Sequence, residues 1–204
     1  MNEVFLDTET TGLSFKDGHK LVEVACIETE DLIPNGKVFH KFLNPNRSMP
    51  EEAFKIHGFS QKFLSDKETF EQVADQFLNF IKGKKIIIHN ASFDFKFLLS
   101  DVKRLKGRAP VGPVLDTLSL ARKVFPGMAN YKLWTLVRHF DFPSGTFHRA
   151  EEDSMYCGLL FAKIVETIEL RGEEASIGRL AALMGREAFQ FPQFKASSDQ
   201  MDLF

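Results

Sequence analysis

Four acidic residues of this chain occupy positions where an acid is a poor structural choice. Asp7 and Glu9 follow a short apolar stretch and are separated by one residue, so a strand would project both to the same side. Asp94 comes just after a second apolar run, and Asp153 lies near the start of a long helical pattern. Functional side chains of sheet proteins gather at strand ends and helix starts. We therefore expect these four carboxyl groups to meet at one site.

Gathered carboxylates predict a metal site. They repel one another, and their ionised forms are costly unless a cation lies between them. Mg²⁺ and Mn²⁺ suit carboxylate and water ligands best, and two such ions about 3.5–4 Å apart can hydrolyse a phosphodiester. We expect two ions of Mg²⁺ or Mn²⁺ on Asp7, Glu9, Asp94 and Asp153. Asp7 is the expected bridge, and Asp94 is expected to act through an intervening water.

A histidine five residues before Asp153 completes the predicted catalytic set. The imidazole of His148 titrates near neutrality, so it can accept the proton of an attacking water. A mobile segment between the two residues would let the histidine move in when substrate binds. Each residue also has a plain structural explanation: a solvated loop for Asp7 and Glu9, helix capping for the other two acids, and a surface position for the histidine.

The hydrophobic pattern predicts the elements that position these residues. Strands are expected at 3–6, 21–27, 37–43, 85–88 and 114–116, with the first three antiparallel and an Asn35-Gly36 hairpin turn before the third. Helices are expected at 69–81, after Asp94, and at 117–125, 131–140, 149–169 and 177–184. This order predicts an α/β fold with a central mixed sheet of about five strands flanked by helices. A composition shift near Arg171 separates a domain over residues 1–170 from a C-terminal tail over 171–204.

The composition, 44% hydrophobic and 26% charged residues, is that of a globular protein. The longest apolar run is far short of a membrane span, and the N-terminus does not have the pattern of a signal peptide. Cys26 and Cys157 lack metal-ligand spacing, so a reducing cytoplasm is the expected location. The net charge of −2 gives no basic footprint for tight nucleic-acid binding, but bound metal ions can make the field at the site positive.

Three segments occur in a fixed order: Asp-Thr-Glu-Thr-Thr-Gly-Leu at 7–13, His-Asn-Ala-Ser-Phe-Asp at 89–94, and His-Arg-Ala-Glu-Glu-Asp at 148–153. Together they resemble the three exonuclease motifs of the DEDDh family, over roughly residues 1–170. The resemblance implies a ribonuclease H-like fold and a metal-dependent 3′→5′ exonuclease that releases nucleoside 5′-monophosphates. The DNA 3′ end would be single-stranded or frayed, and no membrane would be involved.

Intervening segments resemble the proofreading subunits of bacterial replicative polymerases, most clearly at 39–47, 50–58, 63–67 and 115–122. By this resemblance Glu52 and His57 contact the terminal nucleotide. Without the resemblance, Glu52 would be interpreted as an acid in the first turn of a helix and His57 as a histidine in a turn. Residues 128–147, with Tyr131, Trp134 and Phe147, depart from those subunits. A stand-alone or repair exonuclease is therefore an open alternative to a proofreading partner of the polymerase.

The predicted substrate contacts surround the acids. Backbone amides from Thr10 to Leu13 would face the terminal sugar and phosphate, and Gly12 would permit close approach. Leu13 and Phe93 would wall the nucleotide pocket, and bases would be stacked rather than read. The expected substrate-binding residues are Asp7, Glu9, Thr10, Gly12, Leu13, Glu52, His57, Asn90, Phe93 and Asp153.

The last five residues, 200–204, resemble the peptide by which bacterial replication proteins dock on the sliding clamp. The contacts would come from Gln200, Asp202, Leu203 and Phe204, on a flexible polar stretch that orders on binding. A local packing of the final apolar pair on its own domain is the alternative.

Two other functions stay open from the sequence. An exoribonuclease that trims RNA 3′ ends would share the first motif, and a catalytically silent polymerase-associated subunit would share the fold. All five catalytic positions are filled, which disfavours the silent subunit. A phosphatase with Asp7 as nucleophile is disfavoured because no Asp follows two residues later.

Overall fold

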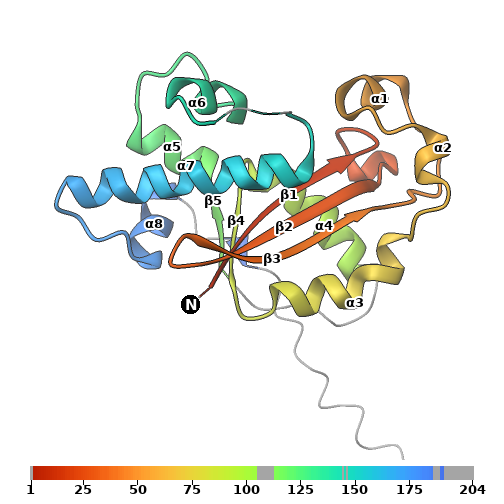
Figure 1. The fold of residues 1–204 in the computed structure, drawn as a ribbon, viewed down its shortest axis with the longest axis horizontal. Helices are drawn as coiled ribbons and strands as arrows, with labels where there is room; N and C mark the ends of the chain where they lie inside the picture. Colours follow the sequence, from red (N-terminus) through yellow and green to blue (C-terminus); the bar gives the residue numbers. More distant parts are fainter. Residues whose placement is uncertain (1, 105–112, 144, 146, 186–188, 191–204) are drawn as a thin grey trace, which may run out of the picture.

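A mixed six-stranded sheet forms the centre of the molecule (Figure 1). The computed structural model describes residues 2–104, 113–143, 145, 147–185 and 189–190. The strand order is β3-β2-β1-β4-β5-β6; β1 pairs in parallel with β4 and β4 with β5, and the other pairs are antiparallel. The strands are β1 (Glu3–Thr10), β2 (Leu21–Glu30), β3 (Ile33–Phe42), β4 (Lys85–Ile88), β5 (Pro113–Asp116) and β6 (Phe189–Gln190).

Helices cover the sheet, and the longest of them, α7, packs across β1 and β2 (Figure 1). The helices are η1 (Phe15–Asp17, a 3₁₀ turn), α1 (Glu51–His57), α2 (Gln61–Leu64), α3 (Phe70–Ile81), α4 (Ala91–Arg104), α5 (Thr117–Val124), α6 (Leu133–His139), α7 (Ala150–Leu170) and α8 (Ile177–Met184). The predicted mixed sheet of about five strands flanked by helices is confirmed, and the sixth strand is a two-residue addition at its edge.

The alternation of side chains along β1 decides which way the first two acids point. Val4 and Leu6 are buried in the core with α3 and α4, while Phe5 is buried in a second core with α5 and α7. Successive strand side chains point to opposite faces. Asp7 and Glu9 therefore continue the Phe5 row, on the face that α7 covers.

The hairpin between β2 and β3 turns earlier than the sequence suggests. The expected turn at Asn35-Gly36 is wrong: the chain reverses at Asp31 and Leu32, which have φ angles of 50° and 66°. Two consecutive positive φ angles are typical of the hairpin turn whose twist matches the strands. Gly36, with φ of 82°, lies within β3. The side-chain amide of Asn35 donates to Glu28 at 3.0 Å, so Asn35 connects β3 to β2 and does not form the turn.

Part of the stretch predicted as a tail packs onto the body. Leu180 and Met184 of α8 are buried in the core of the α7 face, and Met184 Sδ accepts the Asp116 amide at 3.2 Å. β6 pairs with β5 beyond it. Residues 200–204, the predicted clamp-binding peptide, lie outside the described residues. Within the described part of the chain, no helix combines the length and apolar character needed to cross a bilayer.

Candidate active site

The ends of β1 and β4 bring three of the predicted acids together. Asp7 and Glu9 lie on β1, and Asp94 lies in the first turn of α4, just after β4. Because β1 and β4 are parallel neighbours, their carboxyl ends meet at one edge of the sheet. Thr8 joins the two elements, since its hydroxyl donates to Asp94 Oδ1 at 2.6 Å. The pairing of parallel strands thus accounts for the meeting of residues almost ninety positions apart.

The start of α7 supplies the other two residues. The main-chain amide of His148 donates to Asp153 Oδ2 at 3.0 Å, which ties the segment before the helix to its first turn. His148 has a φ of 63°, a left-handed conformation that is uncommon for a non-glycine residue. Its side chain is exposed, whereas Asp153 is buried. The histidine is therefore fixed at its main chain and open to solvent at its ring.

Burial raises the pKa of each of these carboxyl groups, and the charges of neighbouring acids add to the shift. Burial raises the pKa of Glu9 to about 8, with a further contribution from the Asp153 charge. Burial also raises the pKa of Asp94 to about 7 and that of Asp153 to about 6. The pKa of Asp7 is raised well above its ordinary value by burial and by the charges of Asp94 and Asp153. A cation bound among these groups would lower their pKa values, because it favours the ionised forms.

The residues present fit a divalent metal. One ligand atom from each of Glu9, His148 and Asp153 lies within 4.8 Å of the other two. Asp153 Oδ1 is buried and has no hydrogen-bond partner among the described residues, although its sister oxygen accepts the His148 amide. An unpaired buried carboxylate oxygen is costly unless a ligand satisfies it. The carboxylate oxygens of Glu9 and Asp153 are the donors that hard divalent ions prefer.

All five predicted catalytic residues line one cavity of about 770 Å³. Its lining includes six of the ten predicted substrate residues: Asp7, Glu9, Leu13, Asn90, Phe93 and Asp153. Leu13 is 84% exposed and so stands free at the cavity mouth. The catalytic residues that line the cavity are Asp7, Glu9, Asp94, His148 and Asp153.

Four of the predicted substrate contacts lie outside the lining of this cavity. Thr10 is buried, and its hydroxyl donates to the Gly12 carbonyl at 2.7 Å. Glu52 is exposed on α1. His57 is buried at the end of α1; its Nδ1 accepts the Phe59 amide at 3.0 Å, and its buried Nε2 has no partner among the described residues. Burial lowers the pKa of His57, so its ring is neutral at physiological pH.

Gly12 has a packing reason that the sequence does not reveal. A Cβ at this position would lie 2.4 Å from the ring of His19. The same ring lies 3.1 Å from the Thr11 hydroxyl, which fixes its position in the loop after β1. The glycine therefore makes room for His19, and its contact with a nucleotide stays a prediction.

One buried acid next to the site, Glu23, was not predicted from the sequence. Glu23 on β2 is fully buried and lies opposite Glu9 in the strand register. Its Oε2 accepts the Ala150 amide at 3.0 Å, and its Oε1 lies 2.7 Å from His40 Nε2. The other ring nitrogen of His40 lies 3.0 Å from Glu151. Glu23 thus caps the start of α7 from a remote strand, and its hydrogen bond raises the pKa of His40.

Arg149 provides a second anchor that the sequence did not indicate. Its guanidinium donates to the His57 carbonyl and lies over the Phe59 ring, 4.7 Å from the ring centroid. The His57 ring in turn stacks on Phe59 at 4.8 Å. The residue that follows His148 is therefore tied to α1. An acid inside a strand was a visible signal for Glu23, whereas nothing in the sequence distinguished Arg149 from a surface cation.

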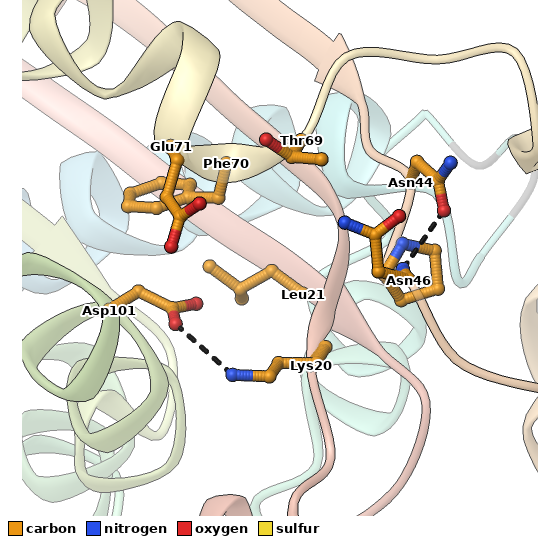
Figure 2. A pocket seen from close by; sticks show the side chains of 9 residues that line it. Lys20, Leu21, Asn44, Asn46, Thr69, Phe70, Glu71 and Asp101 are labelled. Atoms are coloured by element: carbon orange, nitrogen blue, oxygen red, sulfur yellow. Dashed lines mark hydrogen bonds and ion pairs between the residues drawn. The ribbon is translucent and has the colours of Figure 1, made fainter. Parts of the chain in front are cut away.

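A second hollow, of about 150 Å³, lies near the starts of β2 and α3 and contains none of the predicted catalytic residues (Figure 2). Lys20 and Asp101 form an ion pair across it at 3.7 Å. On another wall the Asn46 amide donates to the Asn44 side chain at 2.9 Å. These polar groups of the second hollow form contacts with their own neighbours. The larger cavity is therefore the candidate site.

Comparisons with known proteins agree with this geometry. The model of the exonuclease family (RNase_T) matches residues 4–161. DNA polymerase III subunit epsilon from Rickettsia conorii is 40% identical over 171 residues, which span 81% of this chain and 74% of that protein. The Escherichia coli protein of the same name is 40% identical over 136 residues, 63% of this chain and 56% of its own length.

Solved structures share the fold. Exonuclease X in complex with 5′ overhanging duplex DNA superposes with a TM-score of 0.68 and 25% identity, covering 90% of this chain and 99% of that one. The nuclease domain of 3′hExo, a DEDDh family member bound to rAMP, has a TM-score of 0.68 and 16% identity over 81% of this chain and 92% of its own. These matches confirm the predicted ribonuclease H-like fold.

Proposed function

The chain belongs to the exonuclease family, and from that membership we propose that it is a 3′→5′ DNA exonuclease acting in replication proofreading or repair. The observation that carries the proposal is the gathering of all five predicted catalytic residues around one cavity. The alternative of a catalytically silent subunit leaves that gathering without a purpose, since four mutually repelling acids would destabilise the fold for no return. The catalytic set is Asp7, Glu9, Asp94, His148 and Asp153.

Divalent metal ions are in general use in this family, and this chain has carboxylates to hold them. We assign Asp7, Glu9 and Asp153 as direct ligands of two Mg²⁺ or Mn²⁺ ions, with Asp94 acting through water. Bound there, the ions supply charge neutralisation for the phosphoryl oxygens and a lowered pKa for the attacking water. Asp153 is suited to this role because one of its oxygens is otherwise unsatisfied.

The chain's own groups orient the substrate and move the proton. His148 accepts the proton of the attacking water, because its ring is exposed at the cavity while its main chain is held by Asp153. Leu13 and Phe93 hold the terminal nucleoside, with Thr10, Gly12 and Asn90 at its sugar and phosphate. Glu52 and His57 approach the terminal nucleotide from α1 once the strand is bound. No base is read, because backbone and stacking contacts suffice for any 3′ end.

Hydrolysis of a labelled strand tests this function. The purified chain with Mg²⁺ or Mn²⁺ is expected to release nucleoside 5′-monophosphates from the 3′ end of single-stranded DNA. EDTA would remove the metal ions and Asp7→Ala would remove one of the carboxylates that would hold them, so either is expected to stop release. Unchanged digestion by the Asp7→Ala protein would contradict the assignment. The same assay with a matched RNA strand separates the exoribonuclease alternative, which requires faster digestion of RNA.

The proposal extends to partners and location. The relatives named as polymerase subunits support an association with a replicative DNA polymerase, and residues 200–204 support docking on the sliding clamp. We place the enzyme in the cytoplasm, in keeping with two buried free thiols at Cys26 and Cys157. Pull-down with the clamp is expected to recover the full chain but not a chain that ends at Ser198. Equal recovery of both would refute the clamp contact.

A further inference from the structure

The cavity extends well beyond the catalytic acids, along α6. Its far wall is formed by residues from the end of α5 to the first turn of α6, including Arg122, Tyr131, Lys132 and Trp134. A smaller hollow of about 320 Å³ continues past His148 and is lined by Trp134, Arg138, Phe147 and His148. Trp134, Phe147 and His148 line both spaces. A channel with one continuous wall therefore runs from the catalytic histidine over α6.

Part of the wall of this channel is formed by an aromatic residue, Trp134, in contact with a cation, Arg138. The guanidinium of Arg138 lies 5.2 Å from the centroid of the Trp134 ring. Trp134 nevertheless remains 38% exposed, and Arg138 is exposed. The guanidinium thus lies over the exposed indole ring, and an aromatic ring with a cation against it is the combination that stacks a base and neutralises its phosphate. We call Trp134 and Arg138, with Phe147, the α6 platform.

The platform is held rigidly. Leu136 and Val137, on the other side of α6, are fully buried. Tyr131, just before the helix, donates its hydroxyl to the Phe125 carbonyl at 2.8 Å. Its own carbonyl lies 2.9 Å from Nε2 of His89, which follows β4. The exposed ring of Trp134 is thus presented by a packed helix that is connected to the strand ends of the catalytic site.

Charge supports an anionic occupant. The whole chain carries two more acids than bases, yet residues 117–140 contain Arg122, Lys123, Lys132 and Arg138 and no acid. Three of these cations line the channel. A run of cations interleaved with aromatic residues beside a phosphodiesterase site is complementary to a nucleic-acid backbone.

We propose that the α6 platform binds the nucleotide immediately 5′ to the scissile bond, with its base on Trp134 and its phosphate at Arg138. This inference rests on the proposed function, which assigns the terminal nucleotide to the opposite side of the acids, near Leu13, Glu52 and His57. A base inside a duplex is stacked between its neighbours on both faces and cannot lie on an indole ring, so the platform selects an unpaired end. Trp134 would therefore determine the preference of the enzyme for frayed or single-stranded DNA.

Trp134 is the single tryptophan of the chain, so its fluorescence reports on this platform alone. The Asp7→Asn protein in Mg²⁺ would be titrated with dye-labelled (dT)₄ until the anisotropy of the strand saturates. We expect the tryptophan emission to be quenched in step with the anisotropy. Thymidine 5′-monophosphate, which reaches only the terminal site, is expected to leave it unchanged. A saturated anisotropy with unchanged emission, or a strand that does not bind, overturns the proposal.

Kinetics separate this inference from the proposed function. Thymidine 5′-(p-nitrophenyl phosphate) carries a p-nitrophenyl leaving group in place of the upstream nucleotide, so its hydrolysis measures the catalytic centre without an upstream base and phosphate. In Trp134→Ala the ratio of kcat/KM on a (dT)₈ strand to that on this ester is expected to fall about 5- to 150-fold, the usual effect of one lost base stack. Trp134→Phe is expected to restore most of the ratio.

A matched control comes from Phe63, an aromatic residue of similar exposure that lies outside both spaces. Phe63→Ala is expected to leave the ratio unchanged. If Trp134→Ala also leaves it unchanged while the wild-type protein hydrolyses both substrates, the platform is wrong and the exonuclease function stands. If the wild-type protein hydrolyses neither substrate, the proposed function fails with it.

Discussion

His148 shows how a single residue can be fixed and accessible at once. Its left-handed main chain would be strained for most replacements, but asparagine tolerates this conformation and cannot act as a base near neutral pH. His148→Asn is therefore expected to lower kcat by about 10²- to 10⁴-fold, the usual contribution of a general base. Steady-state hydrolysis checks the rate, and thermal unfolding should match that of the wild type. Wild-type turnover in this variant would remove His148 from the mechanism.

The acid cluster predicts an unusual dependence of stability on pH. The folded protein has pKa values of about 8 for Glu9, about 7 for Asp94 and about 6 for Asp153, whereas unfolded carboxyls titrate near pH 4. Between these values the folded state binds more protons than the unfolded state. These three groups therefore lower the free energy of unfolding as the pH rises from about 4 to about 8.

Urea unfolding in EDTA across this pH range measures the effect. Added Mn²⁺ is expected to oppose the loss increasingly as the pH rises, because the ion binds the ionised carboxylates. The Glu9→Gln protein, which lacks one of the titrating groups, should show a shallower slope. A stability that is flat or rises with pH in EDTA would show that the acids are not held as described.

At the scale of elements, the start of α7 is secured from three directions. Glu23 on β2 accepts the Ala150 amide, His40 on β3 lies against Glu151, and Arg149 reaches α1. These contacts determine where α7 carries His148 and Asp153 relative to the acids of β1. The geometry of the site thus depends on strands that contribute no catalytic residue.

Replacement of Glu23 tests this dependence. Glu23→Ala leaves the Ala150 amide and His40 without their buried partner, and we expect a loss of about 1.5–3 kcal/mol in stability together with a lower kcat. Glu23→Gln keeps an acceptor for the amide and is expected to recover most of both. Denaturant unfolding and steady-state kinetics on the same strand provide the measurements. Equal kcat in the two variants would mean that the cap does not position the site.

Sequence patterns anticipated the elements better than their connections. The predicted strands and helices are found, and Gly83, with φ of 72°, ends α3 as expected, but the short helices α1 and α2 were not predicted. The hairpin turn was misplaced because Asp31-Leu32 does not have the usual turn composition, whereas Asn35-Gly36 does. The meeting of the four acids at one cavity was predictable because their spacing repeats a motif. Glu23 and Arg149 were not singled out, because their roles arise from contacts between segments more than ninety residues apart.

At the scale of the whole molecule, the boundary at residue 170 divides a packed core. Removal of α8 takes Leu180 and Met184 out of the core and exposes the side chains that they cover. Truncation of one such buried side chain usually costs about 2–5 kcal/mol. A chain that ends at Leu170 is therefore expected to lose at least about 3 kcal/mol of stability. A chain that ends at Ser198 keeps α8 and serves as the control. Equal denaturation midpoints for the two would show that α8 adds nothing to the fold.

The catalytic centre joins the two ends of the domain. The first acids lie on β1, whereas His148 and Asp153 lie on α7, whose first turns are held by contacts to β2 that span 127 and 129 residues along the chain. Synthesis on the ribosome proceeds from the N-terminus, so β1 emerges long before its partners. A nascent chain that has not yet released α7 has no assembled site. The nuclease is thus silent throughout most of its own translation, when unguarded hydrolysis could harm nucleic acid nearby.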